Sequence, residues 1–194
     1  MHARSWLTTS RTLAWGAMLL VTGIALLVGA RWFAPIVSAQ QAMREGRSRD
    51  ALDSYRVAEE RLGRSFLARR LAPSLYDTAL SNELSIMYAL KQYDDVIDKA
   101  GATQSAAGRF WAGCALFSKA DVDVSSKNWM NWMSQAQQEF RAALDADPSD
   151  FDARFNYELA GRLILSMKQD PTVERPKDLQ LLVPSSAQAP KKVS

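Results

Sequence analysis

Residues 12–30 form an apolar run without a single charged side chain, bounded by Arg11 and Arg31. A helix of this length rises about 28 Å, which is close to the thickness of the hydrocarbon layer of a bilayer. Backbone polar groups within that layer must pair inside the segment, so a single span has to be a helix. Trp15 and Trp32 stand near the two ends, where indole rings favour the membrane interface. The pattern predicts a transmembrane helix over residues 12–31.

A cleaved signal peptide is the alternative interpretation of this segment, because Val37, Ser38 and Ala39 resemble a small-residue cleavage site. The apolar run is longer than the usual core of a signal peptide, and Arg31 and Trp32 interrupt the approach to that site. A buried helix of a globular domain would keep a polar face, which this run lacks. We therefore expect an uncleaved signal anchor.

The basic residues around the span bear on its orientation. Arg4 and Arg11 precede it without an acidic neighbour, which favours a cytoplasmic N-terminus over residues 1–11. Arg31 and a few later arginines follow the span and weaken this bias. The predicted location is a bacterial inner membrane, crossed once, with the soluble domain in the periplasm.

Beyond the span, apolar residues recur every three to four positions from residue 34 to about residue 168. Neither the alternation of a strand nor the turn residues of a β-hairpin occur there. The pattern predicts an all-α domain over residues 32–168, made of short helices that arrive in pairs. Helices are expected over residues 77–90, from about residue 93, over 106–119, around 128–132 and over 152–167.

Small and large apolar residues alternate at fixed spacings in the third helix pair. Ala136, Phe140, Ala143 and Pro148 are separated by four, three and five positions. The two alanines let a paired helix approach closely, whereas Phe140 fills the groove toward the next pair. Pro148 cannot continue a helix, so the chain has to turn there.

The same spacing opens the domain at Ala51, Tyr55 and Ala58. Counting back twelve positions from Ala51 reaches Ala39, at the small position of the preceding helix. Gly46 lies where that helix should end in a left-handed cap. The first helix pair is therefore expected to begin almost directly after the span.

Charge and composition exclude several classes of protein. The net charge is +3, and removing residues 1–30 leaves 22 basic and 21 acidic residues, so the soluble part has no basic stripe for nucleic acid. From residue 169 onward, prolines interrupt a stretch too polar to build a core, which predicts a disordered tail over residues 169–194.

The residue types needed for catalysis are scarce. The single histidine is His2 and the single cysteine is Cys114, which excludes histidine-based triads and histidine-ligated metal sites in the soluble domain. Neither a glycine-rich phosphate loop nor an HExxH motif occurs. We predict no enzyme activity, no cofactor, no metal ion and no small-molecule substrate.

Candidate contacts with a protein partner are of two kinds. Trp129 and Trp132 are three residues apart and share a helix face, which fits either core packing or an exposed aromatic contact. The polar candidates lie on helices expected to line a concave surface, and they are Asn82, Arg154, Asn156 and Glu158. They can equally be ordinary exposed residues, and Arg154 can pair with Glu158 four positions later.

These spacings resemble those of degenerate tetratricopeptide-repeat proteins across residues 34–168. The segments 140–148 and 152–160 further resemble membrane-anchored repeat proteins encoded with MoxR-type AAA+ ATPases and von Willebrand factor A proteins. One branch of that group, the MxaK-like proteins, accompanies maturation of periplasmic methanol dehydrogenase. The resemblance implies a scaffold or assembly factor whose partner is a membrane-associated von Willebrand factor A protein or a dehydrogenase under maturation. A general periplasmic chaperone or secretion-complex subunit is the alternative.

Overall fold

The computed structural model describes the backbone of residues 3–14 and all atoms of residues 15–103, 105–122, 128–169 and 181–184. Within these ranges every regular element is a helix, which confirms the all-α class. The elements are α1 (Ala3–Arg44), α2 (Ser48–Arg64), α3 (Phe66–Leu71), α4 (Pro73–Ala89), α5 (Tyr93–Gly101), α6 (Ala106–Val122), α7 (Trp129–Ala146) and α8 (Phe151–Gln169).

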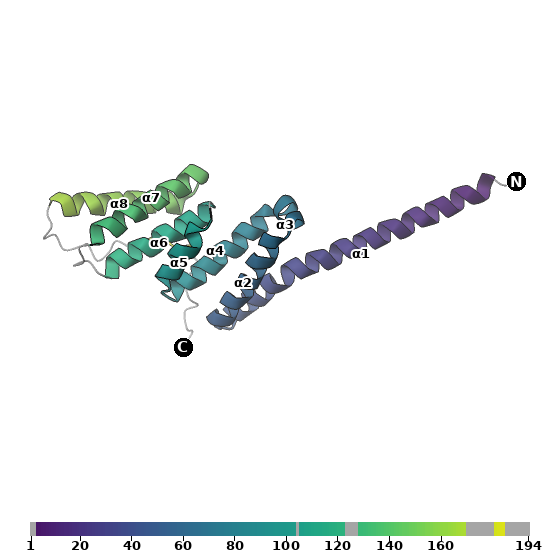
Figure 1. Ribbon diagram of the computed structural model, residues 1–194, viewed down its shortest axis with the longest axis horizontal. Coiled ribbons are helices and arrows are strands. Elements are labelled where there is room, and N and C mark those ends of the chain that lie inside the picture. The colour runs from purple at the N-terminus through teal and green to yellow at the C-terminus, as the bar shows by residue number, and fades with distance from the viewer. Residues whose placement is uncertain (1–2, 104, 123–127, 170–180, 185–194) are drawn as a thin grey trace.

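The helices pack in the order in which they follow one another along the chain. The C-terminal part of α1 lies on α2, α2 lies on α4, and the contacts continue from α4 through α5, α6 and α7 to α8. The first helices of the second and third pairs, α4 and α6, also touch each other. Figure 1 shows the resulting row of helices, from which the N-terminal part of α1 protrudes.

The two predicted small–large–small sets lie in the core. One set is on α2 and the other on α7, and the large residue of each is aromatic. All six residues are buried, namely Ala51, Tyr55, Ala58, Ala136, Phe140 and Ala143. Local spacing therefore identified correctly which face of each helix turns inward.

The end of α1 has the cap that the sequence predicts. Gly46 has a φ of +72°, in the left-handed region that a residue without Cβ enters at no steric cost. Its N–H donates to the Met43 carbonyl at 3.1 Å, and the Arg47 N–H donates to the Ala42 carbonyl at 2.8 Å. These two hydrogen bonds define a Schellman motif, which stops α1 and turns the chain into α2.

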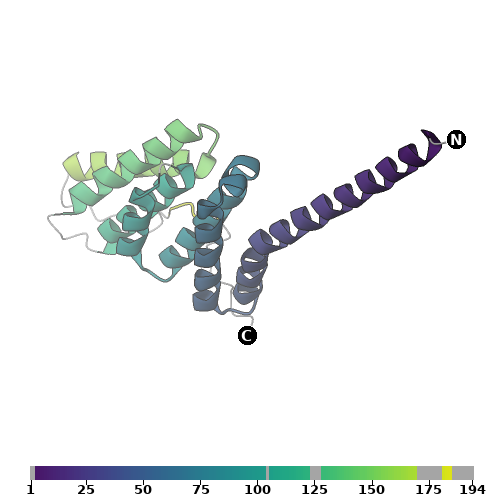
Figure 2. The ribbon, with the colours of Figure 1, turned by 45° about the vertical axis from the view of Figure 1, so that its right-hand side comes forward.

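The protruding part of α1 is apolar and bare. The helix from Trp15 to Arg44 contains a window with a mean hydropathy of 1.8, none of which is buried, and it is long enough to cross a membrane. Figure 2 shows that α1 changes direction as it leaves the array. Pro35 lies inside α1, and proline kinks a helix because it lacks an N–H. Ala39, at the alternative cleavage site, is fully buried in the part that packs on α2.

The short helix α3 was not predicted. It has six residues, which is too few for a helical period to stand out in the sequence. Ser65 starts it, since its hydroxyl accepts a hydrogen bond from the Ala68 N–H at 3.2 Å. Pro73 then begins α4 at the position where a missing N–H costs nothing.

Candidate functional site

A buried asparagine on α8 binds an extended segment of the chain. Asn156 has no exposed surface, and its amide donates to the Leu182 carbonyl at 2.8 Å. The Leu182 N–H donates back to the Asn156 amide oxygen at 2.9 Å. Because both bonds go to the backbone, this clamp recognises an extended peptide without selecting the side chain of the clamped residue.

Local sequence sets the position of Asn156. The Asp150 carboxylate caps α8 by accepting from the Ala153 N–H at 2.9 Å. Beyond the cap, the residues that α8 buries recur every three to four positions. They are Ala153, Asn156, Leu159, Ala160, Leu163 and Ile164. Asn156 is thus the single polar member of an otherwise apolar face, which is why its amide needs a partner.

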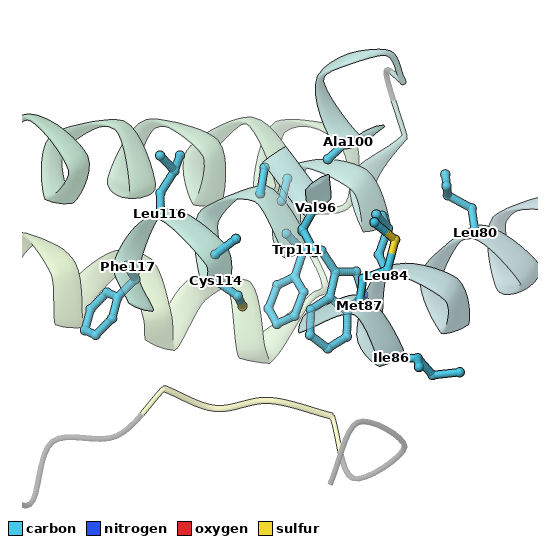
Figure 3. Close-up of a cluster of buried hydrophobic side chains, with 14 of the residues drawn as sticks. Leu80, Leu84, Ile86, Met87, Val96, Ala100, Trp111, Cys114, Leu116 and Phe117 are labelled. Carbon is cyan, nitrogen blue, oxygen red and sulfur yellow. The ribbon is translucent and has the colours of Figure 1, made fainter. Parts of the chain in front are cut away.

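Residues 181–184 lie against the helical core, as Figure 3 shows for the pale yellow segment beside the buried cluster. Leu181 and Val183 are half-buried and pack on that core. Within the stretch predicted as a disordered tail, residues 169–194, these four residues are described, and they contact the domain through apolar packing and the Asn156 clamp. Residues 170–180 and 185–194 lie outside the described part of the chain.

An acidic pocket of about 290 Å³ adjoins this segment, with Pro184 in its lining. α4 contributes Ser81, whose hydroxyl accepts a hydrogen bond from the Trp111 indole N–H of α6 at 3.1 Å. Four carboxylates line the same pocket, and they are Asp77, Asp147, Asp150 and Asp152. The pKa of Asp147 is lowered because the Ser149 hydroxyl and backbone N–H both donate to its carboxylate. Such a pocket favours a cationic side chain.

Asn82 lines a second pocket, of about 350 Å³, between α1 and α4. Its side chain hydrogen-bonds the Tyr55 hydroxyl, whose pKa is raised by burial. Gln40 and Arg44 of α1 also line this pocket. Asn82 therefore lines a pocket on α4 that is separate from the Asn156 clamp and from the acidic pocket.

The two tryptophans pack on the domain instead of projecting from it. Trp129 is buried, so the interpretation as an exposed aromatic contact is wrong for this residue and core packing is correct. Trp132 is half-buried, and the Lys119 ammonium lies 5.3 Å from the centre of its ring. Neither ring lies on α4, α6 or α8, the helices that line the acidic pocket and the clamp.

The charged candidates on α8 make local contacts. Arg154 is exposed and donates to the Pro148 carbonyl at 2.7 Å. Glu158 pairs with Arg162 at 3.5 Å, and not with Arg154, the other arginine four residues away. An i,i+4 pair of this kind on an exposed helix face contributes little to stability. Of the polar candidates on α8, Asn156 alone contacts the extended segment among the described residues.

Sequence reasoning missed the convergence of the acidic pocket and the apolar tail segment. The four aspartates come from α4, from the turn between α7 and α8, and from α8, so no local motif unites them. Residues 181–183 did carry a signal, because three consecutive apolar residues are unusual in a polar, proline-rich tail.

Within the described residues, no group of three or more histidine, cysteine, aspartate or glutamate side chains is arranged to hold a metal ion. No protein-family model, curated protein or solved structure matches the chain.

Proposed function

We propose that this protein is a membrane-anchored helical-repeat scaffold or assembly factor that binds an extended segment of a partner protein. The arrangement in successive helix pairs supports a tetratricopeptide-like array, with α4, α6 and α8 as the first helices that line its groove. The bare apolar part of α1 supports a membrane anchor, which raises the concentration of the domain near other membrane components. We place the domain in the periplasm, following the charge distribution around the span.

The observation that carries the proposal is the Asn156 clamp on the backbone of Leu182. A buried amide that pairs with both backbone polar groups of one residue is the contact a groove needs to hold an extended chain. The chain's own residues 181–184 thus illustrate the kind of ligand that fits, with apolar side chains on the core and their C-terminal end beside the acidic pocket. The expected partner segment is extended, apolar and followed by a basic residue.

A binding measurement on the anchored protein, truncated after residue 180, tests this proposal. The probe is a fluorescent peptide, Leu-Leu-Val-Pro-Lys-Lys, added to the protein in detergent, with binding followed by anisotropy. We expect the truncated protein to bind the peptide and the complete chain to bind it more weakly, because residues 181–184 occupy the groove.

Asn156→Ala in the truncated protein should weaken binding about tenfold or more, since two hydrogen bonds from a buried amide are lost. Asn131→Ala is the matched control, because Asn131 is exposed on α7 and bonds only Gln135 among the described residues. Equal affinity of the Asn156→Ala and Asn131→Ala proteins would refute the groove.

The partner itself is proposed from the resemblance, as a von Willebrand factor A protein or a dehydrogenase under maturation. Cross-linking of detergent-extracted protein, followed by mass spectrometry, distinguishes the assembly factor from a general periplasmic chaperone or secretion-complex subunit. A narrow set of partners fits the assembly factor, whereas a broad set of unfolded proteins fits the chaperone.

A further inference from the structure

The short helix α3 exposes large apolar side chains that nothing in the described chain covers. Phe66 is 72% exposed, Leu67 is 55% exposed and Leu71 is 72% exposed, whereas only Ala68 turns inward. Isolated exposed apolar residues are ordinary on a protein surface, but three within six residues form a patch. An apolar patch of this kind on a domain surrounded by water indicates a surface that another molecule covers when the protein functions.

The same segment is positively charged. Arg64, Arg69 and Arg70 are all exposed, and no acidic residue occurs in the sequence between residues 61 and 75. Arg64 pairs with Glu60 at 2.6 Å, whereas Arg69 and Arg70 form no ion pair with the described residues. Apolar side chains flanked by arginine suit an anionic lipid surface, which takes up both.

The position of α3 relative to the candidate span is set by a contact between α1 and α2. Pro35 has no N–H, so the Arg31 carbonyl loses the helical donor four residues later. The Arg61 guanidinium approaches this carbonyl at 3.5 Å instead. The end of α2 therefore lies beside the residue that follows the apolar run, and α3 begins only a few residues further along the chain.

Figure 1 shows the consequence, with α3 at the end of the array from which α1 protrudes. If residues 12–31 cross a bilayer, α3 lies at the level where the span leaves it. We propose that α3 rests on the membrane surface, with Phe66, Leu67 and Leu71 among the lipid headgroups and its arginines against anionic lipid. The inference rests on the proposed membrane anchor, and it gives the domain a second contact that orients the groove relative to the bilayer.

Depth-dependent quenching in vesicles tests the inference on the full chain. Single cysteines introduced by Leu67→Cys, Leu20→Cys and Val122→Cys each receive an environment-sensitive dye, and spin-labelled lipids serve as quenchers. The native Cys114 does not compete, because it is fully buried and burial raises the pKa of its thiol. All three introduced positions replace exposed side chains, so the fold should be retained.

In vesicles with one-third phosphatidylglycerol, the dye at position 67 should be quenched severalfold more than the dye at position 122, which lies on the exposed end of α6. The paired variant Arg69→Glu with Arg70→Glu should return position 67 to the level of position 122. In pure phosphatidylcholine, the quenching at position 67 should fall as well.

The dye at position 20 reports the anchor separately. Quenching at position 20 without quenching at position 67 overturns the role of α3 and leaves the anchor intact. Absence of quenching at both positions overturns the anchor and the inference together. Quenching at position 67 that persists in the glutamate variant would show that charge does not direct the contact, which also contradicts the proposal.

Discussion

On α6 and α7 the largest buried side chains are aromatic, whereas on α2, α4 and α5 one of the largest is a carboxylate. Trp111 and Phe117 of α6 and Phe140 of α7 are almost completely buried, whereas the ion pair between these two helices, Arg109 to Glu139 at 3.0 Å, is partly exposed. Glu83 of α4 is equally buried, but it meets the Lys99 ammonium at 3.0 Å and the Arg56 guanidinium at 3.4 Å. Both regions nevertheless carry the same small–large–small spacing.

The difference shows that the small–large–small spacing sets how closely two helices approach. The residues of the neighbouring helix then decide whether the large side chain meets polar or apolar groups. Tyr55 and Phe140 occupy matching positions in their sets. The Tyr55 hydroxyl forms a hydrogen bond with the Asn82 side chain. Phe140 instead meets Phe110, at a centroid distance of 6.0 Å. We expect the two regions to respond differently to cavities, to crowding and to pH.

The largest effect should come from removing the aromatic ring at the centre of the apolar region. Phe140→Ala leaves a cavity that the fully buried surroundings cannot fill, which should lower the free energy of unfolding by about 3–5 kcal/mol. Urea denaturation in detergent, followed by circular dichroism, measures this loss. Phe151→Ala is the control, since Phe151 is 67% exposed, and it should change stability by less than about 0.5 kcal/mol.

A smaller effect is expected from crowding the same region. A Cβ atom at Gly113 would stand 2.7 Å from the Phe140 ring, so Gly113→Ala forces buried atoms apart. The loss should be about 1–2 kcal/mol, because the higher helix propensity of alanine offsets part of the strain. At Gly101 a Cβ atom meets nothing within 4 Å, so Gly101→Ala is the matched control in the same denaturation experiment. Equal stability of the two alanine variants would contradict tight packing at α6.

The smallest effect should appear in the polar region, as a dependence on pH. Burial raises the pKa of Glu83, the neighbouring Glu59 adds to this, and Lys99 and Arg56 oppose it. The folded chain therefore holds the Glu83 proton more tightly than the unfolded chain does. Stability from this group is present below the ordinary pKa of glutamate and is lost as the pH rises through the raised pKa.

Glu83→Gln should remove this component, so the wild type should lose stability relative to the variant as the pH rises above about 4.5, the ordinary pKa of glutamate. Denaturation curves of both proteins at several pH values measure the difference. Glu60→Gln, at an exposed position, should give a curve parallel to that of the wild type. A wild-type advantage that grows with pH would mean that the ion pairs outweigh burial at this site.

Much of the fold follows from local pattern. Helices predicted over residues 77–90, 106–119 and 152–167 correspond to α4, α6 and α8 with shifts of a few residues at their ends. The left-handed cap at Gly46 and the cap at Asp150 also follow from residue type, because each depends on contacts within one turn of the helix. The candidate site was predicted less completely, because the sequence pointed to Asn156 but not to Leu182, whose backbone it binds.

Residue order alone determined the helical class, the inward faces of the helices and the apolar run, because each arises from spacings of three to four residues or from an unbroken stretch. Tertiary structure alone decided the rest. Asn156 meets a segment 26 residues away, and Glu83 meets Lys99 from another helix. The position of α3 relative to the candidate span depends on the contact between the Arg61 guanidinium and the Arg31 carbonyl, two residues that are 30 positions apart in the sequence. No local period encodes such contacts, because they form only once the helices have packed.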